Sequence, residues 1–240
     1  PFLRLCVTIG GGDRLGTTEP WHGKLITIDS PADAGKSAIA KRVVKGLGYE
    51  YLDTGAIYRG ITYFLSGRSI RPSEGGNIAH ALEECTISIE KGRVFIDGVD
   101  VSDKIRSPEI DLAVSAYSAL HTVRSFLLQI QKRAASGRKM VAEGRDMGSE
   151  VFPEAPIKFY LDASLEERAT RRWRELNAKG VNITLEEVRK QVQRRDQLDS
   201  EREFSPLRVP EDAHIIDTSK RSPEEVVNVI LAVIEDQRAC

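Results

Sequence analysis

The stretch "ITIDSPADAGKSAIAK", from Ile26 to Lys41, constrains the fold of this chain more than any other. An apolar run leads into a turn of small residues, then into Gly35-Lys36-Ser37 and a helix-forming run. In a strand–turn–helix unit of this kind, backbone N–H groups and the helix N-terminus surround a phosphate, and the lysine reaches the outer phosphates. The pattern predicts a nucleotide-binding loop, with a structural turn that binds no ligand as the alternative.

Two positions of this loop depart from the pattern G-x-x-x-x-G-K-[ST]. Ser30 stands where the pattern has glycine, and it would cost about 1–2 kcal/mol if its backbone had to become left-handed. Asp33 places a carboxylate in the loop, and at about 4 Å from a phosphate charge it would cost roughly 1–4 kcal/mol, depending on the effective dielectric. This cost vanishes if the side chain points to solvent. We expect weakened but not abolished ATP binding.

Strand-like runs alternate with helical stretches, which predicts an α/β fold with a parallel sheet built from βα units. The runs are Leu25–Asp29, Tyr49–Leu52, Lys139–Ala142, Ile157–Leu161 and Ala213–Asp217. Capping boxes, or a proline at the first helical position, mark the helix starts at Ser107, Ser164, Thr184 and Ser222.

Two segments interrupt this alternation. Cys85–Ser102 reads as a β-hairpin turning at Lys91-Gly92 and followed by a short third strand, so we expect an insertion beside the sheet. The Arg- and Glu-rich stretch from Leu165 to Arg202 predicts two helices joined at "NAKGVNIT", with little apolar surface to bury.

Composition bounds the function classes. With 240 residues and 40% apolar content the chain suits one α/β domain, with or without insertions. A net charge of −1 gives no reason to expect nucleic acid or an anionic membrane as partner. Cys6, Cys85 and Cys240 match no metal or disulfide framework, which favours a reducing compartment. Residues 1–24 are interpreted as a leader of unknown role, and the missing export signal predicts a cytoplasmic protein.

Polar side chains follow two further predicted strands. "YLDTGAIYRG" places Thr54 and Arg59 just past one strand end, and "VAEGRDMGSEVFP" places Arg145 and Asp146 past another. Because sheets of this type bind ligands at the carboxyl ends of their strands, we expect these groups to surround one ligand together with the loop.

The motifs "ITIDSPADAGKS", "YLDTGAIYR", "VSDKIRSPEI", "AEGRDMGSEVFPEAPIKFYLDASLEERATRR" and "QRRDQLDSEREFSPL" resemble the bacterial cytidylate (CMP) kinases in order and approximate spacing. The resemblance runs from about Leu25 to the C-terminal helix. It implies a P-loop kinase domain over residues 25–240, a three-layer αβα fold with a five-stranded parallel sheet. It also implies a nucleoside-monophosphate-binding insertion at about residues 61–125 and a helical lid at about 165–200.

The implied reaction transfers the γ-phosphoryl group of ATP to CMP or dCMP, with Mg²⁺, in a protein that we expect to be a monomer. The resemblance implies that Lys36, Arg145, Arg195 and Arg202 are catalytic and that Ser37 binds the metal. ATP would be bound by Ser30, Pro31, Ala32, Asp33, Ala34, Gly35, Lys36, Ser37 and Ala38. The substrate would be bound at its base by Thr54, Arg124 and Asp146, at its sugar by Ser115, Arg195 and Asp199, and at its phosphate by Arg59, Arg145 and Arg202.

The residue chemistry agrees with these roles. Cytosine carries an exocyclic amine that donates hydrogen bonds, so the Asp146 carboxylate suits it, with Arg124 able to hold that carboxylate. A dianionic phosphate is matched by several guanidinium forks. Catalysis then depends on positioning and charge neutralisation, because the attacking phosphate oxygen is already ionised and needs no strong base.

Helical spacing adds two expectations. Arg195, Asp199 and Arg202 share one face if the helix continues through them, with a solvated salt-bridged surface as the alternative. Arg168, Arg171 and Arg172 also cluster, either as lid arginines over ATP or as solvated surface. Ser115 and Arg124 fall on opposite faces of an unbroken helix, so both reach one ligand only if the chain bends near Leu120–His121.

Two alternatives to a CMP kinase stay open. One is a kinase for another acceptor, such as UMP or a molecule that is not a nucleotide. The other is a catalytically weakened nucleotide-binding protein, because Ser30, Asp33 and Ala38 depart from the residues usual in the family on the ATP side. The histidines His22, His80, His121 and His214 show no metal or triad spacing.

Overall fold

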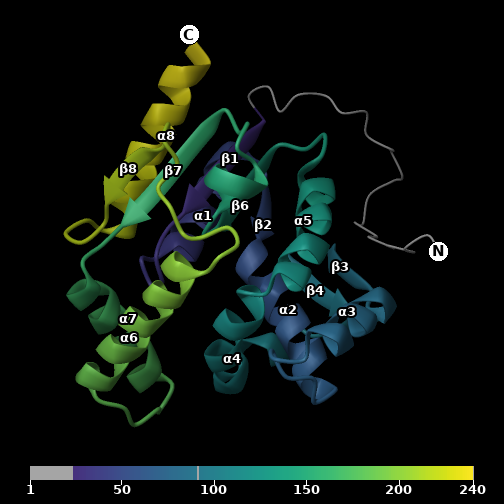
Figure 1. Ribbon diagram of the computed structural model, residues 1–240. Coiled ribbons are helices and arrows are strands. Elements are labelled where there is room, and N and C mark those ends of the chain that lie inside the picture. The colour runs from purple at the N-terminus through teal and green to yellow at the C-terminus, as the bar shows by residue number, and fades with distance from the viewer. Residues whose placement is uncertain (1–23, 91, 240) are drawn as a thin grey trace. The chain divides into compact units, whose positions relative to one another are not determined.

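The computed structural model describes residues 24–90 and 92–239, in two compact units (Figure 1). Of the described residues, the first unit comprises 52–90 and 92–137, and the second comprises 24–51 and 138–239. Nearly all of the predicted leader lies outside the described residues, as do Cys6, His22, Lys91 and Cys240.

A five-stranded sheet in the order β2-β6-β1-β7-β8 organises the second unit. Its strands are β1 (Leu25–Asp29), β2 (Glu50–Asp53), β6 (Met140–Gly144), β7 (Ile157–Asp162) and β8 (His214–Asp217), with β2 ending in the first unit. β1 pairs in parallel with β6 and with β7, and β7 pairs in parallel with β8. The predicted α/β fold with a parallel sheet is confirmed, and the strand bounds differ from the predicted ones by at most two residues.

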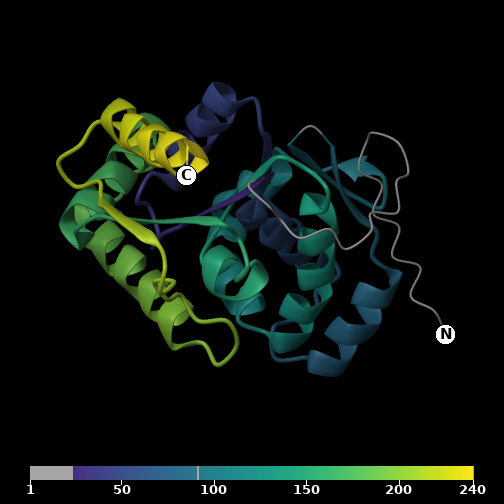
Figure 2. The same ribbon diagram turned by 90° about the horizontal axis from the view of Figure 1, so that it is seen from above.

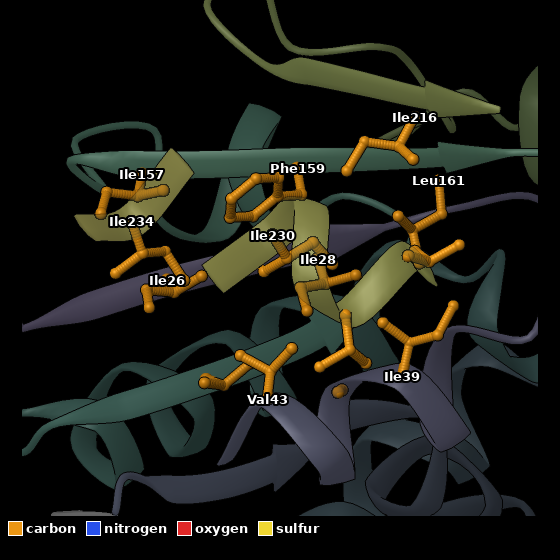
Figure 3. Close-up of a cluster of buried hydrophobic side chains, with 14 of the residues drawn as sticks. Ile26, Ile28, Ile39, Val43, Ile157, Phe159, Leu161, Ile216, Ile230 and Ile234 are labelled. Carbon is orange, nitrogen blue, oxygen red and sulfur yellow. The ribbon is translucent and has the colours of Figure 1, made fainter. Parts of the chain in front are cut away.

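The main core of the second unit lies between this sheet and two helices. Alternate residues of β1, Ile26 and Ile28, belong to a buried cluster with Ile39 of α1 (Lys36–Leu47) and Ile230 of α8 (Pro223–Ala239) (Figure 3). The two helices pack against each other (Figure 2). Side chains alternate along a strand, so Thr27 and Asp29 point to the opposite face of β1. There they meet the π-helical turn η2 (Met147–Val151).

The Arg- and Glu-rich segment forms the two predicted helices, α6 (Leu165–Ala178) and α7 (Leu185–Glu201), which lie side by side (Figure 1). Thr184 caps α7 in a complete capping box with Glu187. Val188 and Val192 are buried against Ala32, so the apolar residues of this pair, although few, pack on the nucleotide-binding loop. The helix ends at Glu201, so the prediction that Arg202 continues one helical face with Arg195 and Asp199 is wrong.

Helices and a small sheet make up the first unit: α2 (Thr54–Gly67), α3 (Gly75–Glu84), η1 (Lys104–Arg106), α4 (Pro108–Ser118) and α5 (His121–Ala135). The sheet is antiparallel and contains β3 (Ile87–Glu90), β4 (Arg93–Ile96) and β5 (Val99–Asp100), which confirms the predicted hairpin and third strand. The bend expected between Ser115 and Arg124 is also present. Leu120 is extended, with φ −76° and ψ 127°, and separates α4 from α5.

No helix in the described part of the chain is long and apolar enough to span a membrane. Within the same residues no group of three or more His, Cys, Asp or Glu side chains is arranged to hold a metal ion. Cys85 is buried, and burial raises the pKa of its thiol to about 12, so at neutral pH it carries no thiolate.

Candidate active site

The loop between β1 and α1 contains two residues in the left-handed conformation, Asp33 and Gly35. Gly35 caps α1 with φ 87° and ψ 8°, a left-handed conformation that glycine adopts without strain. Asp33 is also left-handed, at φ 60°, whereas Ser30 is not among the residues with positive φ. The strain considered for Ser30 therefore does not arise, and the conformation that favours glycine falls on Asp33 instead.

An ion pair between buried Arg168 and partly buried Asp196 contacts the loop from α6 and α7. The carboxylate of Asp196 accepts a hydrogen bond from the Ala32 N–H at 3.0 Å, and the Arg168 guanidinium donates to the Ala32 carbonyl at 3.0 Å. The two side chains also pair with each other at 2.5 Å. Arg168 is only 6% exposed, so it belongs to the interior and not to a solvated surface.

Arg171 makes a second attachment to the same loop. Its guanidinium donates to the Ala34 carbonyl at 3.5 Å and to the Thr218 carbonyl at 2.6 Å. Arg172, by contrast, pairs with Glu175 at 3.0 Å on its own helix. Two of the three clustered arginines therefore hold the loop backbone in place.

Ser37, the residue expected to bind Mg²⁺, donates a hydrogen bond to Glu143 at 2.7 Å. The same carboxylate oxygen of Glu143 accepts from the Tyr51 hydroxyl at 2.6 Å. Glu143 is buried near the carboxyl end of β6. Hydroxyl and carboxylate oxygens are the donors that Mg²⁺ prefers, so this pair fits the metal that the loop pattern implies.

Asp29, the last residue of β1, receives hydrogen bonds from two consecutive backbone amides. Its carboxylate oxygens accept from Met147 N–H at 2.9 Å and from Gly148 N–H at 2.8 Å. Burial raises the pKa of Asp29 to about 7, although these two hydrogen bonds oppose the shift. The bonds join the end of β1 to the turn that follows Arg145 and Asp146.

Arginine and aspartate side chains form a buried network in the second unit. Arg145 pairs with Asp199 at 2.9 Å, and Arg202 lies 3.7 Å from Asp199 and 3.6 Å from Asp146. Burial raises the pKa of the Asp199 carboxyl, but the positive charges of Arg145, Arg195 and Arg202 outweigh it and hold the pKa below its usual value. All five residues, predicted from sequence as substrate contacts, therefore act on one another.

Arg202 reaches this network by a route that the helical spacing did not predict. It is the C-cap of α7 and is extended, with φ −61° and ψ 141°. Its Nε donates to the Ser205 carbonyl at 2.6 Å, and the Leu207 N–H donates to the Asp199 carbonyl at 2.7 Å. The segment after the helix therefore folds back and carries Arg202 to Asp199.

In the first unit, α2 presents Thr54 at its first position and Arg59 five residues later. Asp53 caps this helix through the Ala56 N–H at 2.9 Å, and Arg59 pairs with Asp111 of α4 at 2.9 Å. A Cβ at Gly55 would lie 3.1 Å from Nη1 of Arg59, so the glycine leaves room for the guanidinium to lie over the helix start.

Arg124 is buried in α5 and also faces α2. Its guanidinium donates to the Ser118 carbonyl at 3.0 Å and lies 5.2 Å from the centre of the Tyr58 ring. Ser115 is half-buried on α4. Because the chain breaks between α4 and α5, the Arg124 side chain can bond to the carbonyl of Ser118, the last residue of α4.

The comparisons with known proteins agree with this architecture. Residues 26–236 match the family model described as cytidylate kinase. The chain belongs to the cytidylate kinase family. A cytidylate kinase of Caldanaerobacter subterraneus is 46% identical over 87% of this chain and 93% of its own length. A cytidylate kinase of Thermotoga neapolitana is 41% identical over 90% of this chain and 98% of its own length.

A solved structure supports the fold alone. The crystal structure of an uncharacterized protein from Eubacterium ventriosum superposes with a TM-score of 0.51 at 13% identity, and covers 89% of this chain and 99% of its own.

Four carboxylates of this cytidylate kinase family member were not predicted from the sequence to hold site residues in place: Asp29, Asp111, Glu143 and Asp196. Asp29 and Glu143 stand in apolar strand runs, where an ionisable residue is unusual and signals a specific partner. Asp111 and Asp196 lie in charged helices, where nothing in the sequence separates them from solvated neighbours.

Proposed function

We propose that this protein transfers the γ-phosphoryl group of ATP to CMP or dCMP, giving ADP and CDP or dCDP. Family membership carries the proposal, because the family match spans residues 26–236 and includes every predicted site residue. The buried network of Arg145, Arg202 and Asp199 supports it, since it offers guanidinium groups already held in place for an anionic acceptor.

The acceptor phosphate would be bound by Arg145 and Arg202, with Arg59 contributing from the first unit. A phosphate monoester loses its second proton near about pH 6, so the attacking oxygen is largely ionised at neutral pH. No general base is then needed, and the arginines contribute by neutralising charge and aligning the acceptor. Arg195, within the same charge network, would act alongside them.

Recognition of the base would depend on Asp146. Its carboxylate can accept a hydrogen bond from the exocyclic amine of cytosine, whereas uracil presents a carbonyl at that position. Arg202 lies 3.6 Å from this carboxylate and can hold it in place. We place Thr54 and Arg124 of the first unit in the same role, and Ser115, Arg195 and Asp199 at the sugar.

ATP would be bound by the loop from Ser30 to Ala38. The backbone amides and the N-terminus of α1 surround its phosphates, and Lys36 supplies a positive charge to the outer ones. Mg²⁺, when bound, neutralises phosphate charge, and Ser37 with Glu143 would hold it. We further propose that α6 and α7 form the lid, that the segment at about 61–125 binds the monophosphate, and that the enzyme is a cytoplasmic monomer.

A coupled assay of ADP formation with CMP, dCMP, UMP and AMP as acceptors tests this function. We expect kcat/KM to be highest for CMP or dCMP, and Asp146→Asn to reduce that preference more than it reduces ADP binding. A preference for UMP would identify a different monophosphate kinase. Tight CMP binding without ADP release, in the presence of ATP and Mg²⁺, would identify a nucleotide-binding protein that has lost catalysis.

A further inference from the structure

Asp29 is a buried carboxylate for which the proposed reaction has no direct use. It is fully buried at the end of β1, and each of its two oxygens accepts a hydrogen bond from a different amide of the η2 turn. Met147 and Gly148, which donate these bonds, directly follow Asp146 in the chain. Only a carboxylate offers two acceptor oxygens at this place, because an amide side chain has one.

The same turn lies so close to β1 that its second residue, Gly148, has to be small. A Cβ at Gly148 would lie 2.9 Å from Oγ1 of Thr27 and 2.9 Å from Cγ of Pro210. The turn is therefore seated on the strand by close packing as well as by the Asp29 hydrogen bonds. Any shift of the turn carries Asp146 and Arg145 with it, since no flexible segment separates them.

We propose that Asp29 is a positioning residue for the monophosphate site. Its carboxylate seats the Met147–Gly148 turn on β1 and so determines where Asp146 and Arg145 lie. This inference rests on the function proposed above. Asp29 also precedes Ser30 directly, so one side chain joins the strand that begins the ATP loop to the turn that carries the base-reading residue.

The ionised form of Asp29 performs this task better than the neutral form. A protonated carboxyl keeps one good acceptor oxygen and turns the other into a hydroxyl, which weakens one of the two amide bonds. The groups that act on its charge are Lys36 on α1, Asp146 before the turn and Tyr160 on β7. Burial raises the pKa of Asp29 to about 7, so both forms are accessible near neutral pH.

The test is steady-state kinetics of Asp29→Asn, a variant of the same shape that imitates the protonated acid. We expect KM for CMP to rise about ten-fold or more and the CMP-to-UMP selectivity to fall, because a hydrogen bond to a charged group is lost at the turn. Calorimetric titration with ADP alone should stay within about two-fold of wild type. Asp217→Asn is the matched control, because Asp217 also ends a strand of this sheet and accepts from a backbone amide, Ser219 N–H at 2.8 Å.

The pH profile separates positioning from a merely structural contribution. The ratio of wild-type to Asp29→Asn kcat/KM for CMP cancels the titration of CMP itself. This ratio should be largest at about pH 8 and fall towards one below about pH 6, as wild-type Asp29 becomes protonated. A ratio that stays constant would contradict the role assigned to the ionised carboxylate.

Gly148→Ala provides an independent second variant, since it disturbs the same turn without touching Asp29. It should also raise KM for CMP and lower CMP-to-UMP selectivity while ADP still binds. Unchanged selectivity in both variants, or an equal loss of ADP binding, would overturn the inference. If the wild-type protein itself fails to phosphorylate CMP, the proposed function fails first, and this outcome is distinguishable from the others.

Discussion

Replacing Asp33 in the nucleotide-binding loop should improve both ATP binding and stability, for two separable reasons. Its backbone is left-handed, at φ 60°, which costs most residues about 1–2 kcal/mol and aspartate somewhat less. Its half-buried carboxylate lies in the loop expected to hold phosphate. At about 4 Å and an effective dielectric between that of water and that of a protein surface, the repulsion is roughly 1–4 kcal/mol.

Two variants separate the contributions. Asp33→Asn removes the charge but keeps a side chain that tolerates the left-handed conformation, whereas Asp33→Gly removes both penalties. Because the side chain is partly exposed, we expect the lower end of the electrostatic range, about 1–2 kcal/mol, or roughly 5- to 30-fold tighter ATP binding in both variants. Asp33→Gly should in addition be more stable than Asp33→Asn by about 0.5–1 kcal/mol.

Isothermal titration with ATP and thermal denaturation measure the two effects. The electrostatic gain should shrink as salt is raised, because screening weakens interactions between exposed charges. Asp33 also acts on the charge of Arg145. Burial lowers the pKa of Arg145, whereas the negative charges of Asp199, Asp33 and Asp196 raise it above its usual value, so removing Asp33 leaves the Arg145 charge less compensated. Equal ATP affinity of wild type and Asp33→Asn at low salt would refute the electrostatic reasoning, and equal stability of the two variants would refute the backbone reasoning.

Four further outcomes follow from the contacts. Gly55→Ala should raise KM for CMP about three- to ten-fold with ADP binding unchanged, because its Cβ would lie 3.1 Å from the Arg59 guanidinium. Asp196→Asn should lower stability by about 1–3 kcal/mol and weaken ATP binding, measured by urea unfolding and ATP titration, since it disrupts a partly buried pair that holds the loop. Thr184→Ala should cost about 1 kcal/mol of stability by thermal denaturation, with KM for CMP unchanged. Burial raises the pKa of Asp29 from 3.8 to about 7, so its contribution to wild-type stability is lost progressively as pH rises from about 4 to about 7, and urea unfolding of Asp29→Asn should lack this loss.

Features with local causes could be predicted from the sequence. The strands follow from runs of apolar residues and the helix starts from caps such as Ser107, whose hydroxyl accepts the Ile110 N–H. A break near Leu120 was expected on the condition that Ser115 and Arg124 share a ligand, as the family resemblance implies, and the structure has a break there. Each of these depends on residues within a few positions of one another, and helical or strand periodicity expresses them directly.

Contacts between residues that are far apart in the sequence could not be predicted from helical or strand periodicity. Arg168 lies in a charged helix that reads as surface, yet it is buried because Asp196, 28 residues later, neutralises it. Arg202 was placed on a continuing helix, but the chain leaves the helix at that residue. The sequence grouped Arg195, Asp199 and Arg202 on one helical face, but it did not predict that Arg145 pairs with Asp199.

The arginine–aspartate network of the second unit carries positive charge that attracts an anion, and its carboxylates hold the arginine side chains in place. Three guanidinium groups, on Arg145, Arg195 and Arg202, face the carboxylates of Asp146 and Asp199, which leaves one positive charge in surplus when all are ionised. Arginines without carboxylates would repel one another and lose side-chain freedom on binding a ligand, whereas paired arginines have already lost it during folding. Asp199 thus lowers the positive charge of the network but holds Arg145 and Arg202 in place. If these arginines bind the acceptor phosphate as proposed, their fixed orientation contributes more to the transfer than the lost charge takes away.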